Sequence, residues 1–339
     1  MLDLSILEKF DTQQMYKVYD RWPEIARESF ESNQDSVNFV GINHIVFAGM
    51  GGSGSIGDIF SAILSKSKIH VDVVKGYVLP STVSDKTLVI VTSISGDTSE
   101  SLTILESAID LPCKIIAFSS GGKMERFCHE NSIQYFKISQ IHSPRTSLTQ
   151  FLYTMLKILS DIIPLKNDGI MESITKLNEI KKTISSENLT ESNSALQLAL
   201  WIRDFPFIYY PWGLKAAAIR FKNSLQENSK IHVITEDVIE SCHNGIVSWE
   251  TSSKIQPILI RGQEDNEKTK ERWDIIHQYF SENKIDCKEI ISVEGNILTK
   301  IICLIYLLDY TSIFLAVKKE IDPSPVKSID FIKKRLNKD

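Results

Sequence analysis

Two short loops rich in glycine and hydroxyl side chains most constrain the fold of this chain. The first, GMGGSGS at 49–55, follows the apolar run Ile45–Ala48, and the second, SISGDT at 93–98, follows Leu88–Val91. Each joins a buried-strand pattern to a helix-compatible stretch. In α/β proteins this arrangement brings backbone N–H groups and helix N-termini to an anion at the carboxyl edge of a parallel sheet. Two such loops on nearby strands predict a site for a phosphorylated small molecule.

Strand and helix patterns alternate through most of the chain, after a helical segment at residues 1 to about 40. Continuous apolar strands between helices indicate parallel sheets covered on both faces. The first half is expected to hold strands at 45–48, 70–74, 88–91, 114–118 and 132–137, with helices at 55–65, 98–108 and 148–163. The second half is expected to hold strands at 207–210, 257–260 and 289–293, a short apolar segment at 231–234, and helices at 214–226, 266–280, 297–317 and 325–336.

This scheme occurs twice, so the chain is predicted to be a tandem of two α/β units. Residues 1–163 form the first domain with the two loops, and 193–339 form the second with the C-terminal helix. Between them, 164–192 is polar and rich in Lys, Glu and Ser, and is interpreted as a helical bridge. A chain of 339 residues is long enough for two domains, each with its own core.

Composition excludes several classes of partner. A net charge of −5 argues against broad electrostatic capture of nucleic acid or of an anionic membrane. The most apolar stretch, Ile301–Val317, is short for a membrane span and carries Asp309 in its middle, so a buried helix is expected.

The five cysteines are odd in number and scattered, without a C-x-x-C pair. Neither a disulfide framework nor a structural zinc site is therefore indicated, and reduced thiols in a cytoplasmic protein are expected. The N-terminal stretch is acidic and amphipathic, unlike a signal peptide. No cluster of metal ligands is visible, so neither a metal nor a cofactor is predicted.

A set of motifs resembles the archaeal bifunctional phosphoglucose/phosphomannose isomerases, members of the sugar isomerase (SIS) domain family. The motifs occur in the family's order and span nearly the whole chain: GMGGSGSIGD at 49–58, SISGDTSES at 93–101, Pro144-Arg145, QENSK at 226–230 and CHN at 242–244. The resemblance implies two SIS-type αβα sandwich domains with parallel sheets. It also implies interconversion of glucose 6-phosphate and mannose 6-phosphate with fructose 6-phosphate, in glycolysis and gluconeogenesis, by a homodimer with a shared active site.

The resemblance also implies which side chains hold the sugar phosphate. They are Gly52, Ser53, Ser93, Ser95 and Thr98. The alternative is that these residues only make tight turns after strands. In the family a threonine at position 98 is associated with room for the C2 epimer, which would admit both glucose and mannose 6-phosphates.

One position departs from the family. Asp97 stands where the loop usually carries asparagine, and an anionic side chain near a phosphate would repel it. Because aspartate is a good N-cap residue, we expect Asp97 to point away from the phosphate and to cap the helix that follows. An isoleucine at 94, where aromatic residues are common, is expected to be harmless.

By the same resemblance Glu227 is the base, Arg145 lies near C1 and C2, and His243 and Lys333 assist ring opening. Isomerisation moves a proton between C1 and C2 through an enediolate, so it needs a base, a stabiliser of the oxyanion and a group that opens the ring. Glu227 directly follows the predicted helix 214–226, where partial negative charge at the helix end favours a proton acceptor. The plainer alternative for Glu227 is a solvated glutamate at a helix end.

Arg145 provides a permanent charge beside the enediolate, although a surface ion pair would also explain it. His243 can take and return a proton near neutral pH, and the resemblance implies that it comes from the neighbouring subunit. The assignment of Lys333 rests on the pattern V-x-x-I-x-x-I-K at 326–333, and a slip of one residue would select Lys334.

Three other functions stay open. Gly49-x-Gly51-x-x-Gly54 also satisfies the dinucleotide fingerprint, with Asp72 as the acidic residue, which would indicate a nicotinamide-dependent oxidoreductase. Against it, Asp72 lies inside the strand pattern rather than at its end, and the second hydroxyl loop has no role in a dinucleotide site. A non-enzymatic SIS module that senses a sugar phosphate, and an amino-sugar isomerase of the same fold, are the other two.

Overall fold

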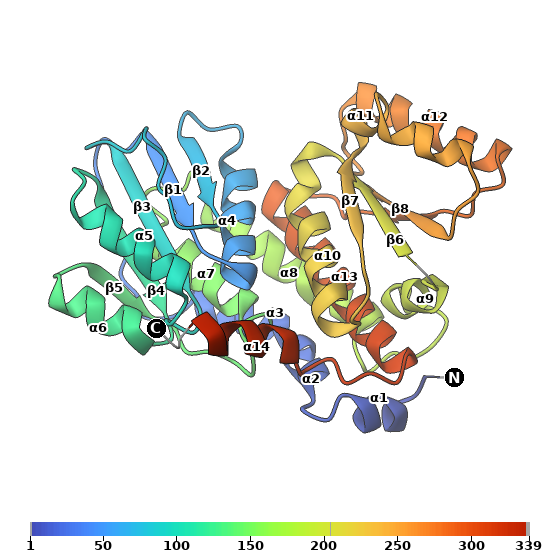
Figure 1. Cartoon of the computed structure of the whole chain (residues 1–339), viewed down its shortest axis with the longest axis horizontal. Coiled ribbons are helices and arrows are strands. Elements are labelled where there is room, and N and C mark those ends of the chain that lie inside the picture. Colours follow the sequence, from blue (N-terminus) through green and yellow to red (C-terminus); the bar gives the residue numbers. More distant parts are fainter. Residues whose placement is uncertain (1, 204, 337–339) are drawn as a thin grey trace.

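The computed structural model describes residues 2–203 and 205–336, and it contains two parallel sheets separated by helices (Figure 1). The first sheet has the strand order β2-β1-β3-β4-β5 and the second the order β7-β6-β8-β9. All pairings are parallel. The strands are β1 (His44–Ala48), β2 (His70–Val74), β3 (Thr87–Ser93), β4 (Lys114–Ser119), β5 (Gln134–Lys137), β6 (Phe205–Tyr210), β7 (Ile234–Asp237), β8 (Ile255–Arg261) and β9 (Lys288–Ile291).

The second sheet repeats the order of the first four strands of the first sheet, so the predicted tandem of α/β units is confirmed. Each sheet has an outer layer of helices. On the first sheet these are α5 (Ser99–Ile109) and α6 (Gly122–Glu130), and on the second α11 (Val238–Ser241) and α12 (Glu267–Glu282). Separate apolar clusters fill these outer layers, one around Val89 and Met124 and the other around Trp273.

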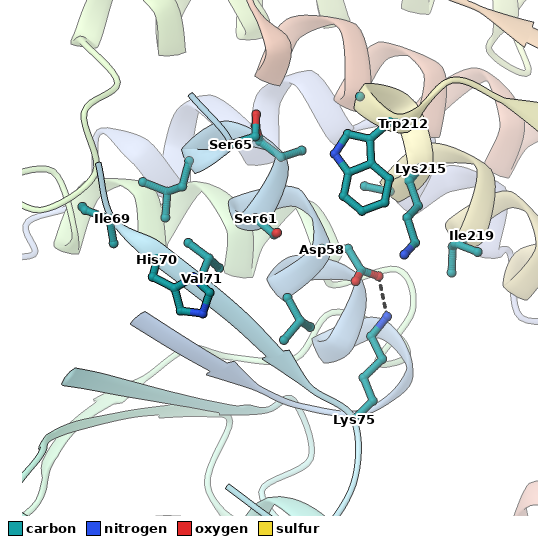
Figure 2. A pocket seen from close by; sticks show the side chains of 15 residues that line it. Asp58, Ser61, Ser65, Ile69, His70, Val71, Lys75, Trp212, Lys215 and Ile219 are labelled. Carbon is teal, nitrogen blue, oxygen red and sulfur yellow. Dashed lines mark hydrogen bonds and ion pairs between the residues drawn. The ribbon is translucent and has the colours of Figure 1, made fainter. Parts of the chain in front are cut away.

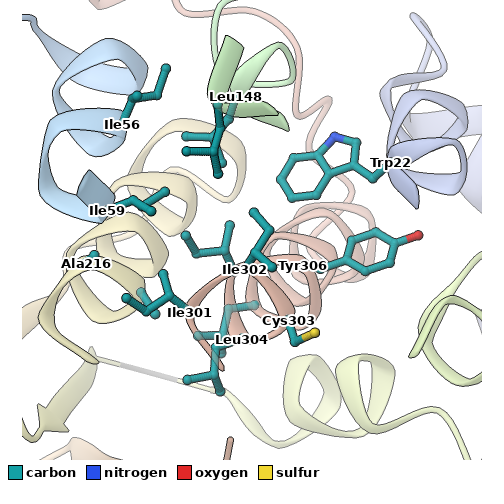
Figure 3. Packing of buried hydrophobic residues seen from close by; sticks show 14 of the residues in the cluster. Trp22, Ile56, Ile59, Leu148, Ala216, Ile301, Ile302, Cys303, Leu304 and Tyr306 are labelled. Carbon is teal, nitrogen blue, oxygen red and sulfur yellow. The ribbon is translucent and has the colours of Figure 1, made fainter. Parts of the chain in front are cut away.

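The inner faces of both sheets share one helical layer and one continuous apolar core (Figure 3). Ile56, Leu148, Ala216 and Ile302 of four different helices meet there with Trp22. The helices of this layer are α3 (Trp22–Phe30), α4 (Gly51–Leu64), α7 (Leu148–Ile158), α8 (Asn167–Ile184), α9 (Ser194–Trp201), α10 (Lys215–Asn228) and α13 (Ile297–Lys318). The remaining helices are α1 (Leu4–Phe10), α2 (Met15–Asp20) and α14 (Lys327–Leu336), with short 3-10 turns at Trp212–Leu214 and Gly245–Glu250.

Helix α13 is the apolar stretch for which a membrane span had to be considered. Among the described residues it is the one helix long and apolar enough to cross a membrane, but 89% of its most apolar window is buried inside the protein. Its neighbours are α8, α9 and α10. The prediction of a buried core helix is therefore confirmed.

The elements that sequence reasoning missed have weak patterns. α6 buries only Met124 and Cys128, so its apolar period is short, and α9 has only eight residues. The apolar segment predicted at 231–234 does not form a strand of its own. Instead β7 begins at Ile234 and runs through polar residues, which an exposed edge strand tolerates.

Two other boundaries differ from the prediction. Helix α7 ends at Ile158 rather than at residue 163. The segment 164–192, interpreted from its polarity as a bridge, contains α8, whose buried face includes Ile170, Ile174 and Leu177 and packs on α13. This segment is thus part of the central helical layer as well as the connection between the sheets.

All five cysteines are free. Burial raises the pKa of the Cys128 thiol to about 11 and, with a smaller opposing effect of Lys176, that of Cys303 to about 12. These two thiols are protonated near neutral pH and are suited to packing rather than to chemistry.

Candidate active site

The first loop joins β1 to the N-terminus of α4. Met50 is the N-cap residue, and its carbonyl accepts hydrogen bonds from Ser53 N (3.0 Å) and Gly54 N (3.2 Å). The loop requires glycine at position 49, because a Cβ there would lie 2.9 Å from both Ser53 Cβ and Thr92 O. The helix N-terminus, with its unpaired N–H groups and partial positive charge, is a suitable receptor for an anion.

The second loop joins β3 to the N-terminus of α5. Ser93 Oγ donates to Thr98 Oγ1 (2.9 Å) and accepts from Gly96 N (3.1 Å), which closes the loop on itself. Gly96 has a φ of +78°, and a Cβ at this position would overlap with Gly121 O. Ser95 Oγ accepts only a long bond of 3.4 Å from Asp97 N. The Ser95 hydroxyl is therefore the one most easily turned to a ligand.

The two loops are joined to each other and to residue 145. Ser53 Oγ accepts a hydrogen bond from Ile94 N (3.2 Å). A Cβ built on Gly52 would lie 3.3 Å from Pro144 O, 3.6 Å from Ile94 Cδ1 and 3.7 Å from Arg145 Cα. The five predicted phosphate ligands thus lie in two adjacent loops at the carboxyl edge of the first sheet, with Arg145 beside them.

Asp97 points away from the loop, as predicted, but it does not cap the helix that follows. The N-cap of α5 is Thr98, which makes no side-chain capping bond, whereas Asp97 Oδ1 accepts a hydrogen bond of 2.9 Å from Lys123 N in the first turn of α6. The prediction named the wrong helix because the neighbour of Asp97 in space comes from the adjacent βα unit. The carboxylate is exposed, so water also screens its charge from the site.

Arg145 joins the first domain to the second. Its Nε donates to Asn228 Oδ1 (2.8 Å), its Nη1 to Glu227 Oε2 (3.4 Å), and its Nη2 to the carbonyls of Pro323 and Ser324 (2.8 Å each). The side chain is only 6% exposed, whereas that of Glu227 is 28% exposed. The guanidinium is therefore held in one orientation, and the carboxylate beside it stays open to a ligand.

The buried ion pair of Arg220 and Asp309 helps to hold Arg145 in place. Arg220 Nη2 donates to Arg145 O (2.6 Å) and, together with Nε, to the Asp309 carboxylate at 2.8–3.3 Å. Asp309 also accepts from Ser224 Oγ (2.5 Å) and Tyr19 OH (3.0 Å). Burial alone would lower the pKa of Arg220, but the adjacent Asp309 outweighs this effect and raises that pKa, so the guanidinium is charged.

His243 lies far from Glu227 in the chain's fold. Each helix of a parallel βαβ unit runs back along its sheet, so α10 ends, with Glu227, at the amino edge of the second sheet. His243 follows β7 and α11 and therefore lies at the carboxyl edge, which is the top of the second domain in Figure 1. The side chain of His243 is exposed. The structure thus brings Arg145 and Glu227 to the phosphate loops, but not His243.

Lys333 and Lys334 are both exposed on α14, which buries none of its side chains within the described part of the chain. The segment that leads to α14 does reach the site, because Arg145 holds the carbonyls of Pro323 and Ser324. The structure therefore connects α14 to the site through the backbone and leaves its lysines pointing into solvent.

Sequence reasoning missed several residues that build the site. Asn228 bridges Arg145 and Ser312 Oγ (2.8 Å), and Lys230 Nζ donates to the carbonyls of Glu227 and Pro323. Burial, and then the charge of Arg145, lower the pKa of Lys230. Both residues belong to the QENSK motif, so a signal was present. Only its glutamate was recognised, because Ser312 and Pro323, which Asn228 and Lys230 contact, lie 84 and 93 residues further along the chain.

The dinucleotide alternative is not supported by β2. Asp72 lies in the middle of this strand, and its carboxylate is 3.0 Å from His44 Nε2. An acid that binds a ribose would have to be free at the carboxyl end of β2.

A separate cleft of about 610 Å³ runs between α4 and β2 on one side and the start of α10 on the other (Figure 2). The ion pair between Lys75 and Asp58 (2.5 Å) lies inside it, and Trp212 and Lys215 face it from the second domain. Lys75 reaches the first loop from this side, because a Cβ on Gly54 would lie 3.1 Å from Lys75 Cε. The cleft thus borders the first loop without containing Glu227 or Arg145.

A curated relative decides the family. The bifunctional phosphoglucose/phosphomannose isomerase of Caldicellulosiruptor bescii is 32% identical over 335 residues, which cover 95% of this chain and 98% of that protein. The chain belongs to the bifunctional phosphoglucose/phosphomannose isomerase family. Another member, from Aquifex aeolicus, is 29% identical and covers 96% of this chain and 99% of its own length.

Family models agree with this membership, and solved structures share the fold. Residues 39–154 match the SIS domain, and residues 191–336 match the bacterial phospho-glucose isomerase C-terminal SIS domain. The solved structure of tagatose-6-phosphate ketose/aldose isomerase from Escherichia coli superposes with a TM-score of 0.68, covering 93% of this chain and 95% of that one. At 12% identity this likeness concerns the fold alone, and the predicted tandem SIS fold is confirmed.

Proposed function

We propose that this protein is an aldose–ketose isomerase that interconverts glucose 6-phosphate and mannose 6-phosphate with fructose 6-phosphate. Its family membership supports this reaction, and one geometric observation supports the assignment of residues. Arg145 and Glu227, from different domains, are 3.4 Å apart beside the loop that holds Gly52. A substrate held by its phosphate in the loops would have its reacting carbons near a base and a fixed cation.

Glu227 is the proposed base. It takes the proton from C2 of the aldose, or from C1 of the ketose, and returns it to the other carbon, so the proton count is unchanged over the reaction. Between these steps the enediolate carries a negative charge. The Arg145 guanidinium faces this charge, and because its other bonds already fix it, little reorganisation is needed when the charge develops.

The two loops are the proposed phosphate receptor. The N-termini of α4 and α5 supply backbone N–H groups and partial positive charge, and the hydroxyls of Ser53, Ser93, Ser95 and Thr98 supply directed donors. Thr98 is also the proposed reason why both C2 epimers are accepted. Its hydroxyl is drawn back to Ser93, which keeps the side chain compact.

Ring opening is assigned to His243 and Lys333. Because His243 lies at the opposite edge of the second sheet from Glu227, we assign the histidine of each site to a second copy of the chain, in a homodimer with shared active sites. Lys333 could reach the substrate from the same chain if α14 packs over the two phosphate loops. The adjacent Lys334 stays an alternative for the same role.

The cell compartment and the pathway follow from the reaction and the thiols. Free cysteines suit a reducing compartment, so the proposed location is the cytoplasm. An enzyme that exchanges these three hexose phosphates would serve carbohydrate metabolism, in glycolysis or gluconeogenesis.

A coupled assay tests the reaction. Purified protein is given fructose 6-phosphate, and glucose 6-phosphate and mannose 6-phosphate are measured separately, for wild type and Glu227→Gln. We expect both products from wild type and a fall in kcat of about 10²–10⁴-fold in the variant, with sugar-phosphate binding retained. No product from wild type would exclude the isomerase, and binding without turnover would favour a sugar-phosphate sensor.

Co-expression of two variants tests the shared site. A hybrid dimer of Glu227→Gln with His243→Ala would contain one doubly altered site and one intact site. Random pairing makes half of the dimers hybrids, so about a quarter of wild-type activity should return from two nearly inactive parents. If activity stays at the level of the parents, His243 does not act across a subunit boundary.

A further inference from the structure

Three polar side chains meet at the amino edge of the first sheet, away from the phosphate loops. His44 begins β1 and His70 begins β2, and the two are register partners in the parallel pair. Asp72 is two residues after His70, so it lies on the same face of β2. Their ligating atoms all lie within 4.8 Å of one another.

The distances within this group are close to those of a metal site. His44 Nε2 is 3.0 Å and His70 Nε2 is 3.5 Å from the same atom, Asp72 Oδ2. Ligands at about 2.0–2.1 Å around a tetrahedral zinc ion are about 3.3–3.4 Å from one another. The ring of His70, whose side chain is 66% exposed, is free to turn by the small amount that would bring the two nitrogens into range.

The surroundings also fit a metal ligand. His44 is buried, and its Nδ1 lies 3.1 Å from Oγ1 of Thr87, the first residue of β3. A histidine that binds a metal through one nitrogen usually donates the other N–H to such an oxygen, which fixes its ring. Nε2 of His44 is then the atom directed at Asp72 and His70.

We propose that His44, His70 and Asp72 form a binding site for one zinc ion. Two imidazoles and one carboxylate are a ligand set that zinc accepts, and the position left open is available to water. His70 lines the cleft of Figure 2, so the ion has a path from solvent. Bound zinc would tie the edge strand β2 to β1.

This site is independent of the proposed isomerase chemistry. His44 and His70 begin their strands and Asp72 lies in the middle of β2, whereas the phosphate loops follow the ends of β1 and β3. Zinc would therefore act on the stability of the sheet edge, and not on proton transfer between C1 and C2.

Zinc titration of the whole protein tests the site. Protein freed of metal with a chelator is titrated against a colorimetric zinc indicator, for wild type, His70→Ala, Asp72→Asn and the control His277→Ala, which changes an exposed histidine of α12. Wild type and the control should bind one equivalent. The two site variants should bind more than about 100-fold more weakly, because loss of an outer partner alone costs 10–100-fold.

A thermal unfolding series gives a second readout. Zinc should raise the Tm of wild type and of His277→Ala, and leave that of His70→Ala unchanged, since a ligand that binds only the folded state stabilises it. Cobalt in place of zinc should give the visible absorption of a tetrahedral site in wild type only. Equal zinc affinity in wild type and His70→Ala, or no binding by either, would overturn the proposal.

The chelator treatment also separates this proposal from the isomerase. Turnover of fructose 6-phosphate should be the same before and after removal of metal, because no ligand of the proposed site touches the proposed substrate. A loss of activity that zinc restores would contradict the independence of the two sites.

Discussion

The two domains share a strand order but differ at the corresponding loops. In the first domain the loops after β1 and β3 carry glycine and serine. In the second, the loop after β6 carries Trp212, which is 72% exposed, and the loop after β8 carries Glu264 and Asp265. These loops lack the glycines and hydroxyls of the first domain, and the two carboxylates would repel a phosphate. The same fold thus has one carboxyl edge suited to an anion and one that is not.

The second domain contributes instead from the opposite end of its sheet. Glu227 lies in the last turn of α10, where the helix has partial negative charge, while the first domain offers the positive ends of α4 and α5. A phosphate receptor needs the positive end of a helix, whereas a base is favoured at the negative end. The comparison shows how two copies of one topology can serve different parts of a single reaction.

The largest effect should come from breaking the buried pair of Arg220 and Asp309 in the second domain, which also bonds to Arg145 O and Tyr19 OH of the first. Asp309→Ala leaves Arg220 buried without its partner and should lower the free energy of unfolding by about 3–5 kcal/mol, measured by urea denaturation. Asp274→Ala is the matched control, because its carboxylate is 75% exposed and its ion pair with Arg261 should contribute less than about 1 kcal/mol. Equal losses in the two variants would show that the domains do not depend on this pair.

Much of the fold could be predicted from sequence because its strongest elements are locally encoded. Strands such as β3, seven residues buried throughout, and the apolar helix α13 carry patterns that have few alternatives. The elements that were not predicted are those whose structure depends on residues distant in the sequence. The edge strand β7 is polar, and α6 shows only two buried positions along its length.

The site residues likewise fall into those that a local motif reveals and those that depend on distant contacts. The loops are contiguous motifs and could be read directly, whereas the bonds of Arg145 to Asn228, Pro323 and Ser324 join segments far apart in the chain. The cluster of His44 and His70 had no sequence signal at all. Only the parallel register of two strands places these residues side by side.

Arg145→Lys tests whether the cation from the first domain must be held by the second. Lysine keeps the charge but loses the bonds that fix the guanidinium to Asn228 and to residues 323–324, so kcat should fall by about 10²–10³-fold. Arg261→Lys, at the end of β8, is the control and should keep wild-type kcat. A normal kcat in Arg145→Lys would mean that charge alone, without orientation, stabilises the enediolate.

A matched pair of glycine substitutions compares the loops after β1 and β6. Gly49→Ala places a Cβ 2.9 Å from Thr92 O, so the loop must shift, at a cost of about 1–3 kcal/mol of stability and with a raised KM for fructose 6-phosphate. A Cβ on Gly213 meets nothing within 4 Å. Gly213→Ala should therefore leave both stability and KM near their wild-type values. Similar KM values for the two variants would contradict the assignment of phosphate binding to the first domain alone.

The smallest effect is expected at Asp97, whose carboxylate in the second loop bonds to the first turn of α6. Asp97→Asn keeps an oxygen that can accept the bond from Lys123 N, and it removes one negative charge from the neighbourhood of the proposed phosphate. Because the carboxylate is exposed and turned toward α6, water screens it, and KM should fall by no more than about five-fold. The measurement is KM for fructose 6-phosphate at low and at high salt, and the difference between wild type and Asp97→Asn should shrink as salt is added.

A larger effect that salt does not reduce would mean that Asp97 turns into the site when the substrate binds. The second loop would then change its conformation on binding, whereas the bonds of Ser93 to Gly96 and Thr98 indicate a loop that is already formed.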